Sequence, residues 1–219
     1  YERAWNAFPF ARYMFNSIFV GLATTALTVF TSAMAAYAFA RLKFKGRDKV
    51  FFVYLSTLMV PIQVTIIPLY MILRILGWHD SYAALIVPPV FSAFGVFMLR
   101  QFFLTIPAEI EEAAKIDGCS SVAIFLRIIL PMSKPGLASL AIFTFVNSWK
   151  SFFWPLIVTS SDKYKTLPIG LYAFSGQYGT DWSALMAATA ISIIPGVIFY
   201  IIFQKSLVEG ISLTGMGGR

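Results

Sequence analysis

Residue types that commonly carry out catalysis are sparse and scattered in this 219-residue chain. The one histidine, His79, has only Asp80 as a neighbouring carboxylate, so a zinc or di-metal site has little support. The single cysteine, Cys119, excludes an internal disulfide and a cysteine metal cluster. The sequence contains no GxxxxGK[ST] phosphate loop, so the chain is not itself an ATPase. An integral membrane enzyme would need a nucleophile, base or metal constellation, and the sequence offers none.

Residues 112–135, which read EAAKIDGCSSVAIFLRIILPMSKP, are more polar at their start than the apolar segments around them. They predict two short helices rather than a loop. Pro107 suits the first turn of the first helix, because proline has no backbone donor to lose there. Three acids then place negative charge near the positive helix end; these are Glu109, Glu111 and Glu112. Gly118 is placed to end this helix in a left-handed C-cap.

The second helix of this hairpin is predicted to begin at a serine cap, either Ser120 or Ser121. Apolar residues then recur at helical spacing; they are Val122, Phe125, Ile128 and Ile129. Pro131 is expected to end the helix. Two short helices between membrane segments indicate a docking device, although a surface hairpin of any membrane protein is the alternative.

Composition places the rest of the chain in a membrane. Hydrophobic residues make up 58% and charged residues only 12%, against about 25% charged in ordinary soluble domains. The net charge of +7 does not indicate nucleic acid, because the basic residues cluster in loops that flank apolar segments. The prediction is an all-α, polytopic membrane protein forming a single domain over residues 1–219.

Five apolar segments are long enough, at about 20 residues, to be transmembrane helices. They are expected at residues 16–40, 50–73, 81–102, 135–158 and 183–203. Pro61 and Pro68 interrupt the second segment, and Pro88-Pro89 the third. Such prolines free carbonyls that need partners in other helices or in a water-filled cavity. With the C-terminus inside, eleven Lys or Arg lie inside and five outside, which fits the positive-inside rule.

The hairpin spacing resembles the EAA loop of binding-protein-dependent ABC importer permeases. The anchors in order are Glu112-Ala113-Ala114, Gly118 after three residues, Ile128 after nine, and Leu130-Pro131 after one. Shorter matches resemble the carbohydrate, MalG-like branch of this family; they include Asn16-Ser17, residues 35–41, residues 149–155 and residues 207–210.

The resemblance implies a cytoplasmic EAA coupling loop at about residues 105–135, and six helices in the full chain, one of them before Tyr1. It also implies several partners: a second permease subunit of similar fold, two cytoplasmic ATPase subunits, an extracytoplasmic solute-binding protein and membrane lipid, with no nucleic acid. ATP and Mg would bind to the ATPase subunits and no cofactor to this chain. The expected location is a bacterial or archaeal cytoplasmic (inner) membrane.

By resemblance, Glu112 is expected to reach a basic residue of the ATPase subunit. The alternative is that Glu112 only caps and solvates its helix. The remaining coupling positions are expected either to pack in the ATPase cleft or to fix the loop against the membrane helices; they are Ala113, Ala114, Asp117, Gly118, Phe125, Leu130 and Pro131.

Lys150 departs from the resemblance, because the family commonly has a neutral polar residue after this tryptophan. A charge in the middle of a membrane helix costs about 2.5–3.5 kcal/mol, so it usually faces a partner or a water-filled cavity. The hypothesis is that Lys150 attracts an acidic solute, such as an acidic oligosaccharide or a sugar phosphate. The alternative is that its side chain extends to the outer interface.

Aromatic faces suit sugar rings, and amides bind hydroxyl groups. Further candidates for the substrate pathway are therefore Trp149, Asn147, Trp154, Gln63 and Tyr70, although each type is also common in packing or interfacial belts. The sequence thus predicts the permease subunit of an ATP-driven carbohydrate importer that works by alternating access. The alternatives are a membrane scaffold that docks through the hairpin, and an importer of a non-sugar solute.

Overall fold

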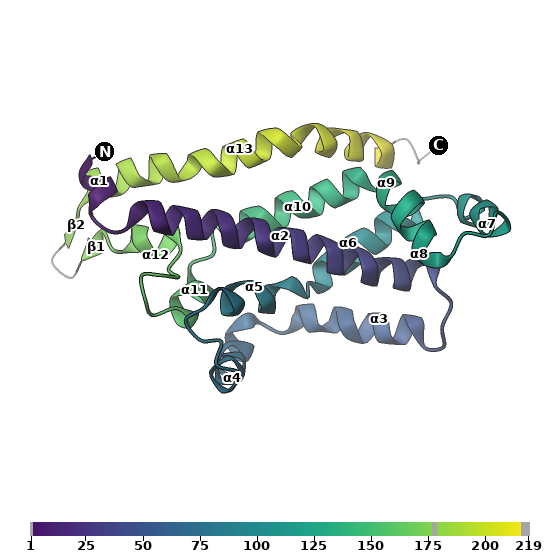
Figure 1. The fold of residues 1–219 in the computed structure, drawn as a ribbon, viewed down its shortest axis with the longest axis horizontal. Coiled ribbons are helices and arrows are strands. Elements are labelled where there is room, and N and C mark those ends of the chain that lie inside the picture. The colour runs from purple at the N-terminus through teal and green to yellow at the C-terminus, as the bar shows by residue number, and fades with distance from the viewer. Residues whose placement is uncertain (1, 177–178, 216–219) are drawn as a thin grey trace. The chain divides into compact units, whose positions relative to one another are not determined.

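The computed structural model describes residues 2–176 and 179–215, and it confirms a predominantly helical protein (Figure 1). In chain order the helices are α1 Glu2–Asn6, α2 Phe10–Arg41, α3 Arg47–Ser56, η1 Thr57–Met59, α4 Ile62–Ile75, α5 Tyr82–Val90, α6 Ala93–Leu104, α7 Ala108–Ile116, α8 Ser121–Ile124, the π-helix η2 Phe125–Ile129, α9 Leu130–Met132, α10 Lys134–Trp149, α11 Phe153–Val158, α12 Leu167–Tyr172 and α13 Trp182–Gly215. The strands within the described residues are β1 Ser175–Gly176 and β2 Gly179–Thr180, which pair antiparallel.

Two helices are long and apolar enough to cross a membrane by themselves, namely α2 and, over Trp182–Ile202, α13. Three further pairs of helices pass the same test together but bend at a short break, so the described residues hold between two and five spans. The breaks follow Met59, Val90 and Met132. Proline explains the first, because Pro61 stands between η1 and α4, whereas Pro68 lies inside α4 without ending it.

The chain forms two compact units. The first contains residues up to Ala26, Ile62–Val90 and Phe143–Ile202, and the second contains Leu27–Pro61, Phe91–Ile142 and the residues from Phe203 onward. Helices α2, α10 and α13 contribute residues to both units.

The first unit is tied together where α2 begins. Asn16 is fully buried, and its side-chain amide donates to the backbone oxygens of Lys163 and Lys165. Its side-chain oxygen accepts a hydrogen bond from the Tyr82 hydroxyl at 2.7 Å. The Ser17 hydroxyl accepts from the Leu167 amide at 2.8 Å. The Asn16-Ser17 pair therefore fixes the segment before α12 against α2.

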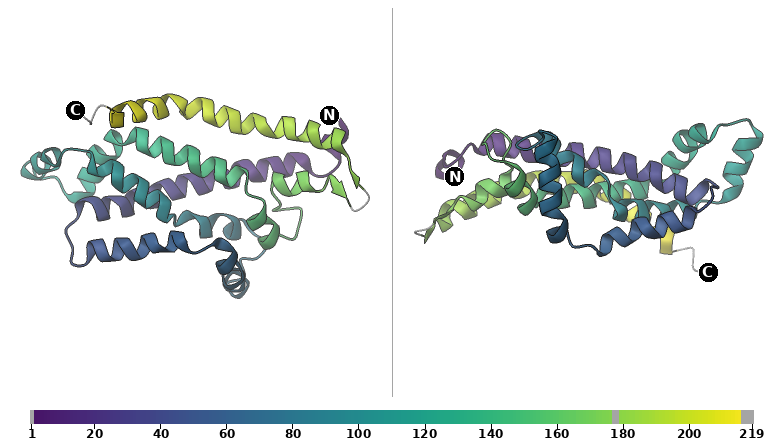
Figure 2. Two further views of the ribbon diagram at one scale, coloured as in Figure 1. Left: turned by 180° about the vertical axis from the view of Figure 1, so that it is seen from behind. Right: turned by 90° about the horizontal axis from the view of Figure 1, so that it is seen from below.

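The core of the second unit is formed by α2, α3, α6, α7 and the α8–η2 segment, with buried residues that include Ala36, Phe51, Leu99 and Ile124. Helices α2 and α6 approach closely at Gly95, where an added Cβ would lie 2.5 Å from the Ser32 hydroxyl oxygen. Small residues commonly allow such approaches between membrane helices. Figures 1 and 2 show α7 lying beyond the end of α2.

Two predicted boundaries differ from the structure. Residues 135–158 are not one helix: α10 ends at Trp149, and α11 begins at Phe153 after a non-helical break. Pro131 does not end the second helix of the hairpin, because the chain remains helical to Met132 and α10 starts at Lys134 after a 77° bend. The last apolar segment was expected to end at residue 203, but α13 continues to Gly215, and residues 216–219 lie outside the described part.

Candidate functional site: a docking helix and a cavity

The predicted hairpin is present in the second unit, with the caps that its sequence indicates. Pro107 directly precedes α7, and Gly118 follows it with φ at +80°, a left-handed value that favours glycine. The Ser120 side chain caps α8 by accepting a hydrogen bond from the Ala123 amide at 3.2 Å. A left-handed glycine and a serine cap thus separate α7 from α8.

One face of α7 is exposed and carries the predicted docking residue. Glu112 and Ala113 are both exposed, and Ile116 is 87% exposed. We call Glu112, Ala113 and Ile116 the outer face of α7. Ala114 is buried in the core instead. The outer face therefore presents a carboxylate beside an apolar patch.

The other predicted coupling residues divide into two groups. Asp117 and Gly118 are exposed at the end of α7. Phe125 is buried, with its ring centroid 5.1 Å from that of Tyr37, and Leu130 packs against the same core. Pro131 is exposed in α9.

The helical face predicted from Val122 onward is wrong in one respect, because Val122 is 66% exposed. The buried residues are Ile124 and the predicted Phe125 and Ile129, and Ile124 and Ile129 stand five positions apart. That spacing matches η2, a π-helix with hydrogen bonds from residue i to i+5. Pro131 supplies a cause, since its ring would clash with the carbonyl four residues earlier in a regular α-helix.

The hairpin is attached to the membrane helices by a buried arginine. The Arg41 Nε lies 3.0 Å from Oε1 of Glu111, and both side chains are at most 10% exposed. The same guanidinium donates through Nη2 to the backbone oxygens of Phe103 and Ile106. Arg41 thereby joins the end of α2 to the end of α6 and to α7.

A second arginine extends this attachment to α3. Arg100 donates from Nε to the Phe39 backbone oxygen at 3.2 Å, and its guanidinium lies 4.4 Å from the centre of the Phe51 ring. Its Nη2 also lies 3.7 Å from a carboxylate oxygen of Asp48. We refer to Arg41, Glu111 and Arg100 as the arginine network.

Sequence reasoning did not find this network. Arg41 was expected only as a topological charge, and Glu111 only as a charge near a helix end. The available signal was that each side chain is charged at the edge of an apolar segment, where a charge needs a partner. The pairing itself joins residues that are far apart in the sequence, so local spacing does not predict it.

The first unit contains a cavity of about 520 Å³ between α10, α12 and α13. Its lining includes Trp149, Lys150, Ser192 and Tyr200. The Trp149 ring stacks on Phe145 with the ring centroids 5.9 Å apart. We call this the Lys150 cavity. It combines aromatic faces with one cationic side chain.

Lys150 does not lie in the middle of a helix, as the sequence suggested, but directly after the last residue of α10. Its side chain is exposed, and it stands at the negative end of the α10 dipole, which stabilises a positive charge. The cost of its charge is therefore lower than the mid-helix estimate.

The structure does not bring all the predicted pathway residues together. Asn147, Trp154, Gln63 and Tyr70 are not among the described residues that line the Lys150 cavity. Trp154 donates its indole N–H to the Ala84 backbone oxygen at 3.0 Å, which is a packing role. Tyr70 contacts the His79 ring edge-to-face, with the centroids 5.4 Å apart, and Gln63 is exposed on α4.

Two aspartates hold the connecting segments of the first unit. Asp80 has a φ of 55°, and its carboxylate accepts from the amides of Ser160 and Ser161 at 2.9 and 3.0 Å. Desolvation raises the pKa of Asp80, but these hydrogen bonds outweigh it and the net shift is downward. The hydrogen bond from Lys165 and then that from Tyr13 likewise lower the pKa of Asp162.

Among the described residues, no group of three or more His, Cys, Asp or Glu side chains is close enough to hold a metal ion. The outer face of α7 and the Lys150 cavity are the two candidate sites that contain predicted site residues.

Known proteins resemble this chain over most of its length. It is 38% identical over 207 residues to the arabinooligosaccharides transport system permease protein AraQ of Bacillus subtilis (strain 168), covering 94% of this chain and 74% of that relative. It is 34% identical over 220 residues to the sulfoquinovosyl glycerol transport system permease protein SmoH of Agrobacterium fabrum (strain C58), covering 100% of this chain and 77% of that protein. These relatives confirm the predicted resemblance to the carbohydrate branch.

The fold is also that of a solved transporter. A chain in the crystal structure of a bacterial ABC transporter involved in the import of the acidic polysaccharide alginate matches with a TM-score of 0.83 at 23% identity, over 93% of this chain and 77% of that one. The model of one family, described as binding-protein-dependent transport system inner membrane component, matches residues 28–213. This chain therefore belongs to the family of inner-membrane permease components of binding-protein-dependent ABC importers.

Proposed function

We propose that this chain is the permease subunit of an ATP-driven carbohydrate importer and that the outer face of α7 receives the force of the ATPase subunit. The observation that carries the proposal is the exposure of Glu112 on a helix whose neighbouring acid, Glu111, is buried against Arg41. Glu111 therefore serves attachment, and Glu112 remains available to a basic group of a partner. The adjacent Ile116 supplies an apolar contact.

The proposed arrangement has five transmembrane helices in this chain, with the EAA loop at residues 105–135 and the C-terminus in the cytoplasm. A second permease subunit of similar fold completes the pathway. Two ATPase subunits bind the coupling loops, and a solute-binding protein delivers the solute on the opposite side. The alternative of a scaffold protein lacks support from the relatives, whose names describe transport permeases.

In the proposed cycle, ATP closes the two ATPase subunits, and their clefts displace α7. The arginine network passes this displacement to the ends of α2 and α6 and to α3, because Arg41 and Arg100 contact each of these elements. Helices α2 and α10 continue into the unit that holds the Lys150 cavity. Energy coupling is then a shift between two conformational populations.

The proposal is tested by ATP hydrolysis in the reconstituted complex of this chain with its partner permease, ATPase subunits and solute-binding protein. Solute-loaded binding protein is expected to stimulate hydrolysis, and Glu112→Gln to reduce that stimulation about tenfold or more, since hydrogen bonds to charged groups contribute about 1.5–3 kcal/mol. Glu109→Gln, on the same helix and also exposed, is the matched control and should behave as wild type. Undiminished stimulation in Glu112→Gln complexes would contradict the assigned role.

For the solute, we infer a carbohydrate or glycoside, as in the names of the two relatives. Trp149 and Tyr200 in the Lys150 cavity offer aromatic surface to sugar rings, and Ser192 and Thr189 also line it. Lys150 favours an acidic member of this class over a neutral one. The coupling test does not depend on this assignment.

The acidic-solute assignment is tested by Lys150→Gln. With an acidic oligosaccharide as solute, the concentration for half-maximal transport should rise about tenfold to 150-fold, because a hydrogen bond to a charged group contributes about 1.5–3 kcal/mol. Transport of a neutral oligosaccharide of the same length should be unchanged. Equal transport of the acidic solute by the variant and wild type would exclude Lys150 as the determinant of charge selectivity.

A further inference from the structure

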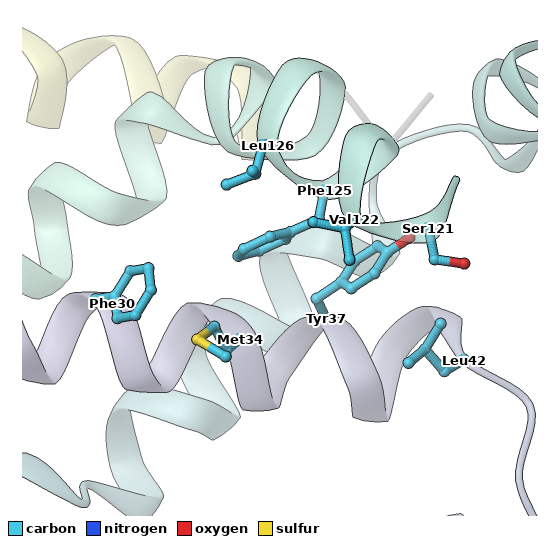
Figure 3. A pocket seen from close by; sticks show the side chains of 8 residues that line it. All are labelled: Phe30, Met34, Tyr37, Leu42, Ser121, Val122, Phe125 and Leu126. Carbon is cyan, nitrogen blue, oxygen red and sulfur yellow. The ribbon is translucent and has the colours of Figure 1, made fainter. Parts of the chain in front are cut away.

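The second unit has an apolar groove to which neither the outer face of α7 nor the arginine network contributes a residue, although the second part of the coupling hairpin forms one of its walls. It has a volume of about 310 Å³ and lies between α2 and the α8–η2 segment (Figure 3). Its lining residues are Phe30, Met34 and Tyr37 of α2, Leu42 directly after α2, and Ser121, Val122, Phe125 and Leu126 of the hairpin. Several are well exposed, with Phe30 at 53%, Val122 at 66% and Leu126 at 50%.

The two ends of the groove differ in polarity. Figure 3 shows Phe30, Met34 and Leu126 at one end, while the Tyr37 hydroxyl points toward the end that Ser121 and Leu42 line. Directly after Leu42, the chain carries Lys43 and Lys45, both of them exposed. Within the described part of the chain, neither lysine forms an ion pair. The groove is thus hydrocarbon-like along its length, and the end lined by Ser121 and Leu42 adjoins the chain segment that carries two exposed lysines.

Its length matches one leaflet of a bilayer. Phe30 and Leu42 are twelve residues apart, along α2 and the residue that follows it, or about 18 Å at 1.5 Å per residue. The hydrocarbon layer of one leaflet is about 15 Å, half of about 30 Å. A partner's transmembrane helix spans both leaflets and would contact this groove over only part of its length. A single lipid chain with its headgroup at the lysines has the required length and polarity.

We propose that this groove binds one anionic phospholipid, with an acyl chain against Phe30, Met34 and Leu126 and the phosphate near Lys43 and Lys45. Ser121 and Tyr37 offer hydroxyl donors at the headgroup end. Basic residues at a membrane surface attract anionic headgroups, and the apolar lining binds the chain. The lipid then lies between α2 and the coupling hairpin. Its contacts with both therefore stabilise the position of the hairpin.

The first test measures phospholipid retained by the purified importer complex, by native mass spectrometry after exchange into mixed phosphatidylglycerol and phosphatidylcholine nanodiscs. The wild-type complex should retain phosphatidylglycerol in preference to phosphatidylcholine. Replacing both lysines (Lys43→Gln with Lys45→Gln) should reduce the preference roughly 30-fold, from a factor of about five per lysine. Lys163→Gln removes one positive charge from a connecting segment of the other unit and should leave the preference unchanged, whereas Lys43→Gln or Lys45→Gln alone should already reduce it about fivefold. An unaltered preference in the double variant would overturn the proposal.

The second test fills the groove. Met34→Trp should abolish retention of the lipid, whereas Leu27→Trp, on the same helix at similar exposure but outside the groove, should not. A photoreactive amino acid at Val122 of the intact complex then identifies the occupant by the mass of its adduct. A phospholipid adduct supports the proposal. An adduct with a partner subunit, or the absence of a lipid adduct, contradicts it. Neither test depends on transport, so both are independent of the proposed solute and coupling role.

Discussion

At the residue scale, the Arg41 guanidinium holds together three parts of the second unit that are distant in sequence. It pairs with the Glu111 carboxylate and donates hydrogen bonds to the backbone oxygens of Phe103 and Ile106. Because this arrangement is buried, its stability is sensitive to substitution: removal of one member leaves the others desolvated and unpaired. Glu112, one residue further along, is exposed and free of that constraint.

We expect Arg41→Ala to destabilise the complex by about 3–5 kcal/mol, the usual cost of breaking a buried ion pair by removing one partner. The double variant Arg41→Met with Glu111→Leu should recover much of this loss, since it leaves no buried charge. Thermal unfolding in nanodiscs measures the change, with Arg127→Ala, an exposed arginine of η2, as the control. If the double variant were as unstable as Arg41→Ala, the unpaired carboxylate would not be the cause.

At the element scale, the sequence predicted the caps of the hairpin but not the shape of its second helix. Ser120 and Gly118 act through neighbours within a few residues, so their roles follow from local chemistry. The π-helix corresponds to the set of residues that is buried in the core, and this set is not evident from the sequence. The apolar spacing around Val122 also fits a regular helix. The break after Trp149 was missed for a similar reason, because residues 149–155 remain apolar and aromatic enough to continue a span.

The arginine network and the Lys150 cavity are harder to predict from the sequence than these local features. Arg41 and Glu111 are separated by most of two membrane segments, and nothing in their immediate neighbours specifies the pairing. Likewise, Trp149 and Lys150 were predicted together as neighbours, but Tyr200 enters the same cavity from α13. The remaining predicted pathway residues were chosen by residue type alone. The type of a residue does not determine whether its side chain faces a cavity or the surroundings of the helix.

The segment after α4 and the segment after α11 are joined through Asp80, which predicts a pH dependence. Its lowered pKa means that the folded state favours the carboxylate, so the stabilisation is complete above the unfolded value of about 4 and is lost as the pH falls through the folded value. We therefore expect Asp80→Asn to lower the unfolding temperature at pH 7 and to have little effect once the pH is below the folded pKa of Asp80. Thermal unfolding of both proteins from pH 7 into the acid range is the measurement. A difference that persisted undiminished at low pH would show that the carboxylate charge is not the cause.

At the scale of the whole molecule, the chain offers a direct test of its proposed topology, because Cys119 is its single cysteine. In a Cys119→Ser background, Ser160→Cys is expected to react with a membrane-impermeant maleimide added to intact cells. Lys49→Cys, in the first turn of α3, should react only after the membrane is opened. The reverse pattern would place the coupling loop outside and contradict its contact with an ATPase.

The attachment of α7 through Arg41 also bears on how permeases of this kind can be recombined. A graft of residues 105–135 from another permease would carry in a foreign loop and leave Arg41 of the recipient behind. If the donor loop lacks an acid at the position of Glu111, the recipient arginine loses its partner, however well the new loop fits the ATPase. The exchangeable module is therefore discontinuous, and it includes the end of α2 as well as the hairpin. Chimeras that transfer both parts should assemble where simple loop exchanges fail.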